Sequence, residues 1–223
     1  MKDLIEKILD YLPRYLLVFG VVFSGPKKFI AERRLNAEEE WGNALLFLAI
    51  SATLVAIVAT LTQAAGKDLW SQVAGTALGL LIAVTLGATS VRISWWLVGG
   101  RADAQSFFIT YAYTFGVVII ILVAFQVLGV GVFKMLDPDL HAKALKKQAT
   151  ESELTSSTVY LVVLAINIVG FLVVSLWGFI AWGAYRQLNG LSKFRSSLAL
   201  MIQGVLSIPI AAAVFFVVSA LTT

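Results

Sequence analysis

The stretch SFFITYAYTFGVVIIILVAFQVLGVGVF, residues 106–133, contains no charged side chain and consists largely of apolar residues. An α-helix needs roughly 20 such residues to cross the hydrocarbon core of a bilayer, so this stretch is long enough to span one. Inside the bilayer every backbone polar group must be hydrogen-bonded within the protein, which favours a helix. The stretch therefore predicts a membrane-spanning helix.

Four further runs of similar character flank it, and they set the fold class. Of the 223 residues, 59% are hydrophobic and only 13% are charged, whereas soluble domains carry about 25% charged residues. The charges lie mostly between the long apolar runs, which cover residues 42–65, 70–98, 158–185 and 196–221. We therefore predict an all-α integral membrane protein with five transmembrane helices.

The distribution of lysine and arginine predicts the orientation of these spans. An odd number of spans places the two termini on opposite sides of the membrane. With the N-terminus inside, 12 of the 17 Lys and Arg residues lie on the inner side and five on the outer side. Cytoplasmic loops carry the excess of positive charge, so we predict a cytoplasmic N-terminus and an external C-terminus.

The segment before the first span is predicted to lie on the membrane surface. Only ten residues separate Arg14 from Gly25, too few to cross a bilayer. Apolar side chains recur at helical spacing, including Leu9 and Leu16, and Lys27 and Lys28 are placed to meet anionic headgroups. We expect an N-terminal amphipathic interfacial helix along the cytoplasmic leaflet; a re-entrant hairpin and a helix packed into a soluble core are the alternatives. The predicted units are a cytoplasmic arm, residues 1–35, and a five-helix domain, residues 36–223.

Helix-capping residues indicate where several helices begin and end. Thr150 is followed three residues later by Glu153, the pattern of a capping box. In the outer loop, Asp137 followed by Pro138 predicts the start of a short surface helix. Gly190 follows the fourth run, where a left-handed residue closes a helix.

The second span carries a stripe of small residues. Gly75, Gly79, Ala83 and Gly87 recur every four positions and so lie on one face of the helix. Helices in lipid associate through close backbone approach, which small side chains permit. This face is predicted to pack tightly on another helix, in the same chain or in a second copy.

Arg92 is the one charged residue clearly inside a predicted span. A charged group within a membrane helix is a candidate functional residue. It precedes Trp95 by three residues, so its long side chain is also able to reach the headgroup region as a structural anchor. Both interpretations, an interfacial anchor and a ligand or lipid site, are kept.

The sequence offers no pattern typical of catalysis or of metal binding. No Asp, Glu or His lies within a predicted span, and the chain has no cysteine and a single histidine, His141. Proton relays, metal centres and intramembrane proteases require such groups at depth. We therefore predict a non-enzymatic protein without cofactor or metal.

Three stretches resemble the Yip domain family, whose members are Rab-interacting membrane proteins. FSGPKKFI, residues 23–30, is similar to the Gly-Pro segment before its spans; TYAYTFGVVII, residues 110–120, to the start of its third span; and AYRQLNGLSKFRSSLALMI, residues 184–202, to the connection into its last span. The resemblance covers most of the chain and, because the arm is short, points to a prokaryotic-type member. It implies five spans and a cytosolic N-terminus.

These observations predict a scaffold or accessory subunit that acts through helix–helix and interfacial contacts. The expected partners are membrane lipids and a membrane protein or a second copy of the chain, and no nucleic acid; the expected location is the bacterial inner membrane. A small transporter or lipid-handling channel is the alternative. A continuous hydrophilic cavity through the bundle would favour that alternative.

Overall fold

The computed structural model of the chain describes residues 2–33, 37–62, 69–146 and 148–222, which are helical apart from their connections. Side chains are described for residues 11–32, 39–58, 79, 82–146, 148–150, 152–209 and 212. The helices are α1 (Lys2–Ser24), α2 (Pro26–Arg33), α3 (Ala37–Thr62), α4 (Leu69–Leu97), α5 (Ala104–Leu136), α6 (Pro138–Leu145), α7 (Glu151–Ser156), α8 (Thr158–Asn189) and α9 (Lys193–Thr222).

Three helices are long and apolar enough, within their described residues, to cross a membrane. They are the segment Glu39–Val58 of α3, the whole of α5 and the whole of α8. Helices α4 and α9 each contain a stretch whose side chains are not described. The all-helical fold and the membrane character are thus supported, whereas five spans and an amphipathic interfacial first helix stay predictions.

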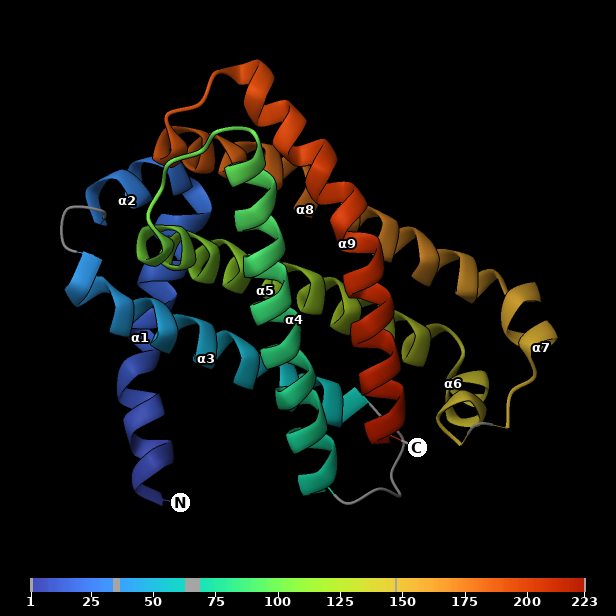
Figure 1. Cartoon of the computed structure of the whole chain (residues 1–223). Coiled ribbons are helices and arrows are strands. Elements are labelled where there is room, and N and C mark those ends of the chain that lie inside the picture. The colour runs from blue at the N-terminus through green and yellow to red at the C-terminus, as the bar shows by residue number, and fades with distance from the viewer. Residues whose placement is uncertain (1, 34–36, 63–68, 147, 223) are drawn as a thin grey trace.

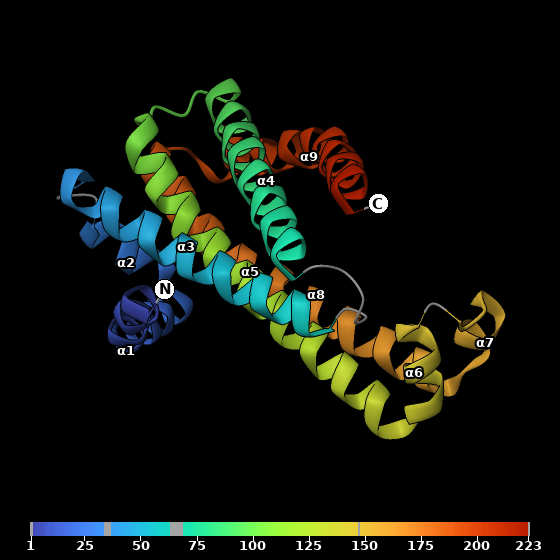
Figure 2. The same cartoon turned by 90° about the horizontal axis from the view of Figure 1, so that it is seen from below.

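The long helices form two layers. Helices α3, α5 and α8 run side by side, with α5 in the middle (Figures 1 and 2). Helices α4 and α9 pack on each other and cross one face of that layer (Figure 1). Helix α1 is seen along its axis in Figure 2 while the three-helix layer is seen lengthwise, so α1 runs across the layer.

Glycines bring α5 close to both of its neighbours. A Cβ atom added to Gly116 would lie 2.7 Å from Cε1 of Phe47 on α3. A Cβ atom added to Gly170 of α8 would lie 2.7 Å from Cγ of Phe125 on α5. Both positions therefore require a glycine, as expected where membrane helices pack closely.

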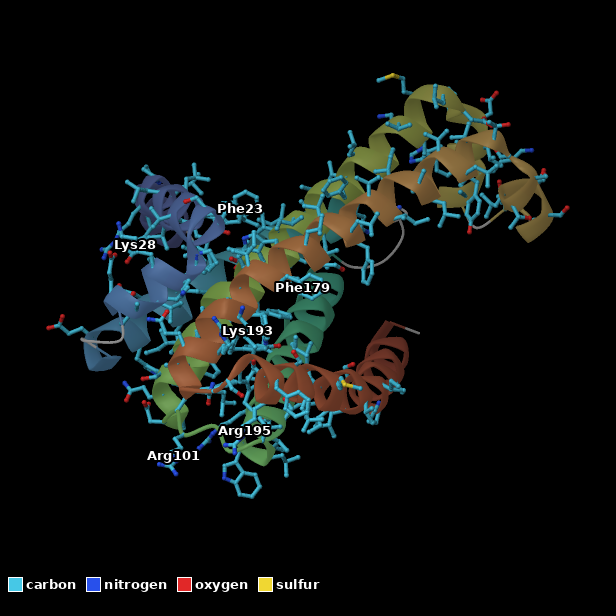
Figure 3. The ribbon with its side chains drawn as sticks, turned by 90° about the horizontal axis from the view of Figure 1, so that it is seen from above. Phe23, Lys28, Arg101, Phe179, Lys193 and Arg195 are labelled. Carbon is cyan, nitrogen blue, oxygen red and sulfur yellow. The ribbon has the colours of Figure 1, made fainter. Side chains whose placement is uncertain are left out.

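One end of the molecule gathers several helix ends and most of the described cations. Here the Tyr185 ring, near the end of α8, lies 5.8 Å from the Trp95 ring of α4 and 5.4 Å from the Phe107 ring of α5, measured between centroids. Arg101 and Arg195 extend outward at this end (Figure 3), and Lys193 begins α9 there. We call it the basic end; α6 and α7 lie at the opposite end (Figure 1).

The helix caps are of the types predicted from the sequence, but one of them begins a different helix from the one expected. Asp137 accepts a hydrogen bond from the backbone N–H of Leu140 at 2.9 Å and caps α6, which confirms the predicted surface helix. Thr150 and Glu153 form the predicted capping box, but it starts the short helix α7, and Ser157 caps α8. Gly190 closes α8 with a φ of 64°.

Candidate functional site

The arm, defined as α1 and α2, is fastened to the three-helix layer by buried aromatic contacts. The Tyr15 ring stacks on Phe47 with centroids 4.9 Å apart, and its hydroxyl lies 3.0 Å from that of Ser51. The Trp177 indole N–H of α8 donates to the Phe23 carbonyl at 2.9 Å. Sequence reasoning did not find this attachment, because the residues opposite Tyr15 and Phe23 belong to distant helices.

Helix α2 continues the attachment at the basic end. Phe29 and Ile30 are 4% and 5% exposed, and the Phe29 ring meets the Tyr113 ring edge to face with centroids 4.8 Å apart. The residue between the two helices, Gly25, sits directly before Pro26, which is buried. The arm is therefore packed onto the bundle from Tyr15 in α1 to Ile30 in α2.

The side of the arm that faces away from the bundle, which we call its outer side, is apolar and exposed. Leu16, Leu17 and Val21 are 59%, 68% and 44% exposed, although Tyr15 directly before them and Val22 directly after them are buried. Lys27 and Lys28 are also exposed, and Lys28 makes a 3.9 Å ion pair with Glu32. Of the predicted interfacial residues, Leu16, Lys27 and Lys28 thus lie on the surface, and the side chain of Leu9 lies outside the described residues.

The small-residue stripe of α4 is only partly described. Gly79 is buried and Ala83 and Gly87 are half-buried, while Gly75 lies outside the residues whose side chains are described. A Cβ atom added to Gly87 would lie 3.2 Å from Cζ of Tyr111 on α5, and closer still to its hydroxyl. At Gly87 the close neighbour is therefore α5 of the same chain.

Hydrogen bonds between side chains join α4 to α9. The side-chain carbonyl of Gln203 accepts hydrogen bonds from the hydroxyls of Ser90 at 2.9 Å and Ser94 at 3.3 Å. Ser94 is fully buried, so these bonds satisfy polar groups away from water. They fix the first half of α9 against the last turns of α4.

A buried acid lies near the start of α3. Glu40 is 3% exposed and accepts a short hydrogen bond from the Tyr113 hydroxyl, and the Asn43 side-chain amide is 3.4 Å away. This hydrogen bond joins α3 to α5, and it was not predicted from the sequence. A tyrosine in the middle of an apolar run was the one available signal for this contact.

Arg92 lies at a pocket between three helices. The pocket has a volume of about 490 Å³ and opens beside the last turns of α4 and the first turns of α3 and α5. Its lining is Trp41, Ala88, Thr89, Arg92, Ala104, Gln105, Phe107 and Phe108. Arg92 itself is exposed, and among the described residues it forms no ion pair. The pocket combines one cation with an aromatic and aliphatic wall.

Within the described part of the chain no group of three His, Asp or Glu side chains is placed to hold a metal ion. Comparison with protein-family models found no matching family, and comparisons with curated proteins and with solved structures found no match either. The resemblance to the Yip domain family therefore stays a prediction that depends on the three sequence stretches.

Proposed function

We propose that the chain is a non-enzymatic five-span membrane protein of the Yip type that acts as a scaffold or accessory subunit at the cytoplasmic surface. The observation that carries the proposal is the arm, which is attached by buried contacts on its inner side and exposes an apolar surface on its outer side. A fixed helix with an apolar outer face is suited to contact both lipid and a partner helix.

Five crossings are supported by the residues that meet at the basic end. Trp41 begins the apolar part of α3, Arg92 lies near the end of α4, and Phe107 lies in the first turn of α5, yet all three line one pocket. If α3 and α5 both cross from this end, the chain must return between them, and α4 is the helix that the structure describes in that interval. Helix α9 begins at the same end, packs on α4 and runs antiparallel to it (Figure 1).

The same end supplies the argument for orientation. Arg101, Arg186, Lys193 and Arg195 all lie in its connections or in the adjoining helix turns. The guanidinium of Arg186 lies over the Trp182 ring, 5.6 Å from its centroid, an arrangement typical of the headgroup region. The excess of positive charge favours a cytoplasmic basic end in a bacterial inner membrane.

The scaffold proposal is tested by site-specific photo-crosslinking in native membranes. A photoreactive residue at Leu17, 68% exposed on the outer side of the arm, is expected to yield discrete protein adducts with a partner or a second copy. The matched control is Leu161, 59% exposed on α8 far from the arm, which is expected to react with lipid alone. Lipid adducts alone at Leu17, or the same protein adducts from both positions, would contradict the proposal.

A small transporter or lipid-handling channel is the second candidate function. The specific observation in its favour is the open pocket of about 490 Å³ beside Arg92. Transport requires a hydrophilic path across the bundle, and a solute flux assay in proteoliposomes distinguishes it from a scaffold.

A further inference from the structure

We infer that the Arg92 pocket binds one anionic phospholipid, with the phosphate on Arg92 and the upper part of an acyl chain against the aromatic wall. This inference is independent of the scaffold role and of any partner of the arm. It follows from the residues that line the pocket, from the contacts of the Arg92 guanidinium and from the position of the pocket along the helices.

The lining divides into a polar and an apolar part. Arg92 supplies side-chain N–H donors and Gln105 further polar surface, while Trp41, Ala88, Phe107 and Phe108 supply apolar surface. The rings of Trp41 and Phe108 lie 4.7 Å apart between centroids, so the wall consists of packed aromatic side chains. A ligand with one anionic group joined to a hydrocarbon chain matches both parts.

The guanidinium of Arg92 is available to such a ligand. It forms no ion pair with any described residue, and the two acids nearest the pocket in the sequence are engaged elsewhere. Glu40 accepts from Tyr113, and the Asp103 carboxylate accepts from the backbone N–H of Ser106 at 2.7 Å. A guanidinium in this state binds a phosphate group through paired, charge-assisted hydrogen bonds.

In the five-span arrangement proposed above, on which this step rests, the pocket lies at the depth of lipid headgroups. Arg92 is five residues before the end of α4 at Leu97, about 7.5 Å along the axis at 1.5 Å per residue. The neighbouring residues Ile93 and Trp96 of α4 are 42% and 67% exposed, so apolar surface leads from the outside of the molecule toward the pocket. A lipid is therefore able to enter sideways from the bilayer.

The volume also fits a part of a lipid. Small-molecule sites usually enclose about 300–1,000 Å³, and this pocket encloses about 490 Å³. That space is enough for a phosphate, a glycerol unit and the first carbons of a chain, while the rest of the chain lies in the bilayer. A soluble anion would leave the aromatic wall uncovered, which favours the lipid as the occupant.

The test is native mass spectrometry of the full-length protein, released from micelles that contain phosphatidylglycerol or phosphatidylcholine with identical acyl chains. The wild type is expected to retain one phosphatidylglycerol molecule in preference to phosphatidylcholine. Arg92→Gln is expected to weaken phosphatidylglycerol binding at least about tenfold, the scale of losing a charge-assisted hydrogen bond. Thr89→Trp, a bulky replacement at an exposed pocket residue, is expected to abolish retention while leaving Arg92 in place.

The matched control is Arg195→Gln, which removes the same charge from an exposed position at the same end but outside the pocket. It is expected to retain phosphatidylglycerol like the wild type. Equal retention of the two lipids by the wild type, equal losses in the Arg92 and Arg195 variants, or full retention by Thr89→Trp would overturn the inference. Displacement of the lipid by glycerol phosphate alone at similar concentration would identify a soluble anion as the ligand instead.

Discussion

Replacing Gly116 by alanine is expected to destabilise the contact between α3 and α5. The added methyl carbon would lie 2.7 Å from Cε1 and 3.0 Å from Cδ1 of Phe47, and 3.0 Å from the hydroxyl oxygen of Ser51. Carbon atoms pack at about 3.5–4.0 Å, so at least one neighbour must move.

Neither neighbour of Gly116 is free to move cheaply. Phe47 is 3% exposed and lies between the rings of Tyr15 and Tyr113, at centroid distances of 4.9 Å and 5.1 Å. Ser51 is fully buried and donates to the Phe47 carbonyl at 2.9 Å. Overpacking of this kind costs about 1–3 kcal/mol, which corresponds to roughly a 5- to 150-fold change in the folding equilibrium.

The control is Gly131→Ala in the same helix, because no atom apart from the neighbouring residues and the local helix backbone lies within 4 Å of the Cβ position there. Both variants gain the higher helix propensity of alanine, about 1 kcal/mol, so the difference between them isolates the packing cost. The measurement is unfolding in mixed micelles followed by tryptophan fluorescence. If Gly116→Ala proved as stable as Gly131→Ala, the close approach of α3 and α5 at this point would be refuted.

Two further predictions concern polar groups. Tyr113→Phe removes a hydrogen bond to the buried Glu40 and is expected to lower the free energy of unfolding by about 1–3 kcal/mol. The control Tyr160→Phe, at a 39% exposed position, should change it by less than about 0.5 kcal/mol. Equal unfolding midpoints of the two variants would contradict the buried contact. The second prediction concerns Glu153, which lies in the connection between α5 and α8. The backbone N–H of Thr150, and next its hydroxyl, lower the pKa of Glu153 below its usual 4.5. The capping box therefore stabilises α7 above pH 4.5, and this stabilisation is lost as the pH falls through the lowered pKa. Thr150→Val should raise that pKa toward 4.5 in an NMR titration, and an unchanged titration midpoint would argue against the hydroxyl contact.

Much of the fold follows from local sequence patterns. Two apolar runs form most of α5 and α8, and caps lie at Asp137 and Gly190. Both features depend on residues that are neighbours in the chain, so a single sequence shows them directly. The capping box at Thr150 was found for the same reason, although it begins a helix of its own. The separate start of α8 was missed because Ser157 lacks a carboxylate three residues later.

The packing glycines and the pocket depend on contacts between distant segments. Gly170 has no small residue four positions away on either side, so no stripe marks it, yet it meets Phe125. Arg92 was recognised from its place in a span, but the aromatic wall beside it includes Trp41, which arrives only when α3 packs against α5. Tertiary arrangement of this kind is not encoded in the spacing of residues along one helix.

Cysteine accessibility in intact cells tests the five-span arrangement with a cytoplasmic basic end most directly. The chain has no cysteine, so single probes report without background. The probes are Met135→Cys, 80% exposed toward the α6 end, Phe194→Cys, 81% exposed at the basic end, and a cysteine added after Thr223. With a membrane-impermeant maleimide, Met135→Cys and the added cysteine are expected to react from outside, and Phe194→Cys only after permeabilisation. An added cysteine that reacts only after permeabilisation, as Phe194→Cys does, would show that α9 does not cross the membrane and would contradict the account.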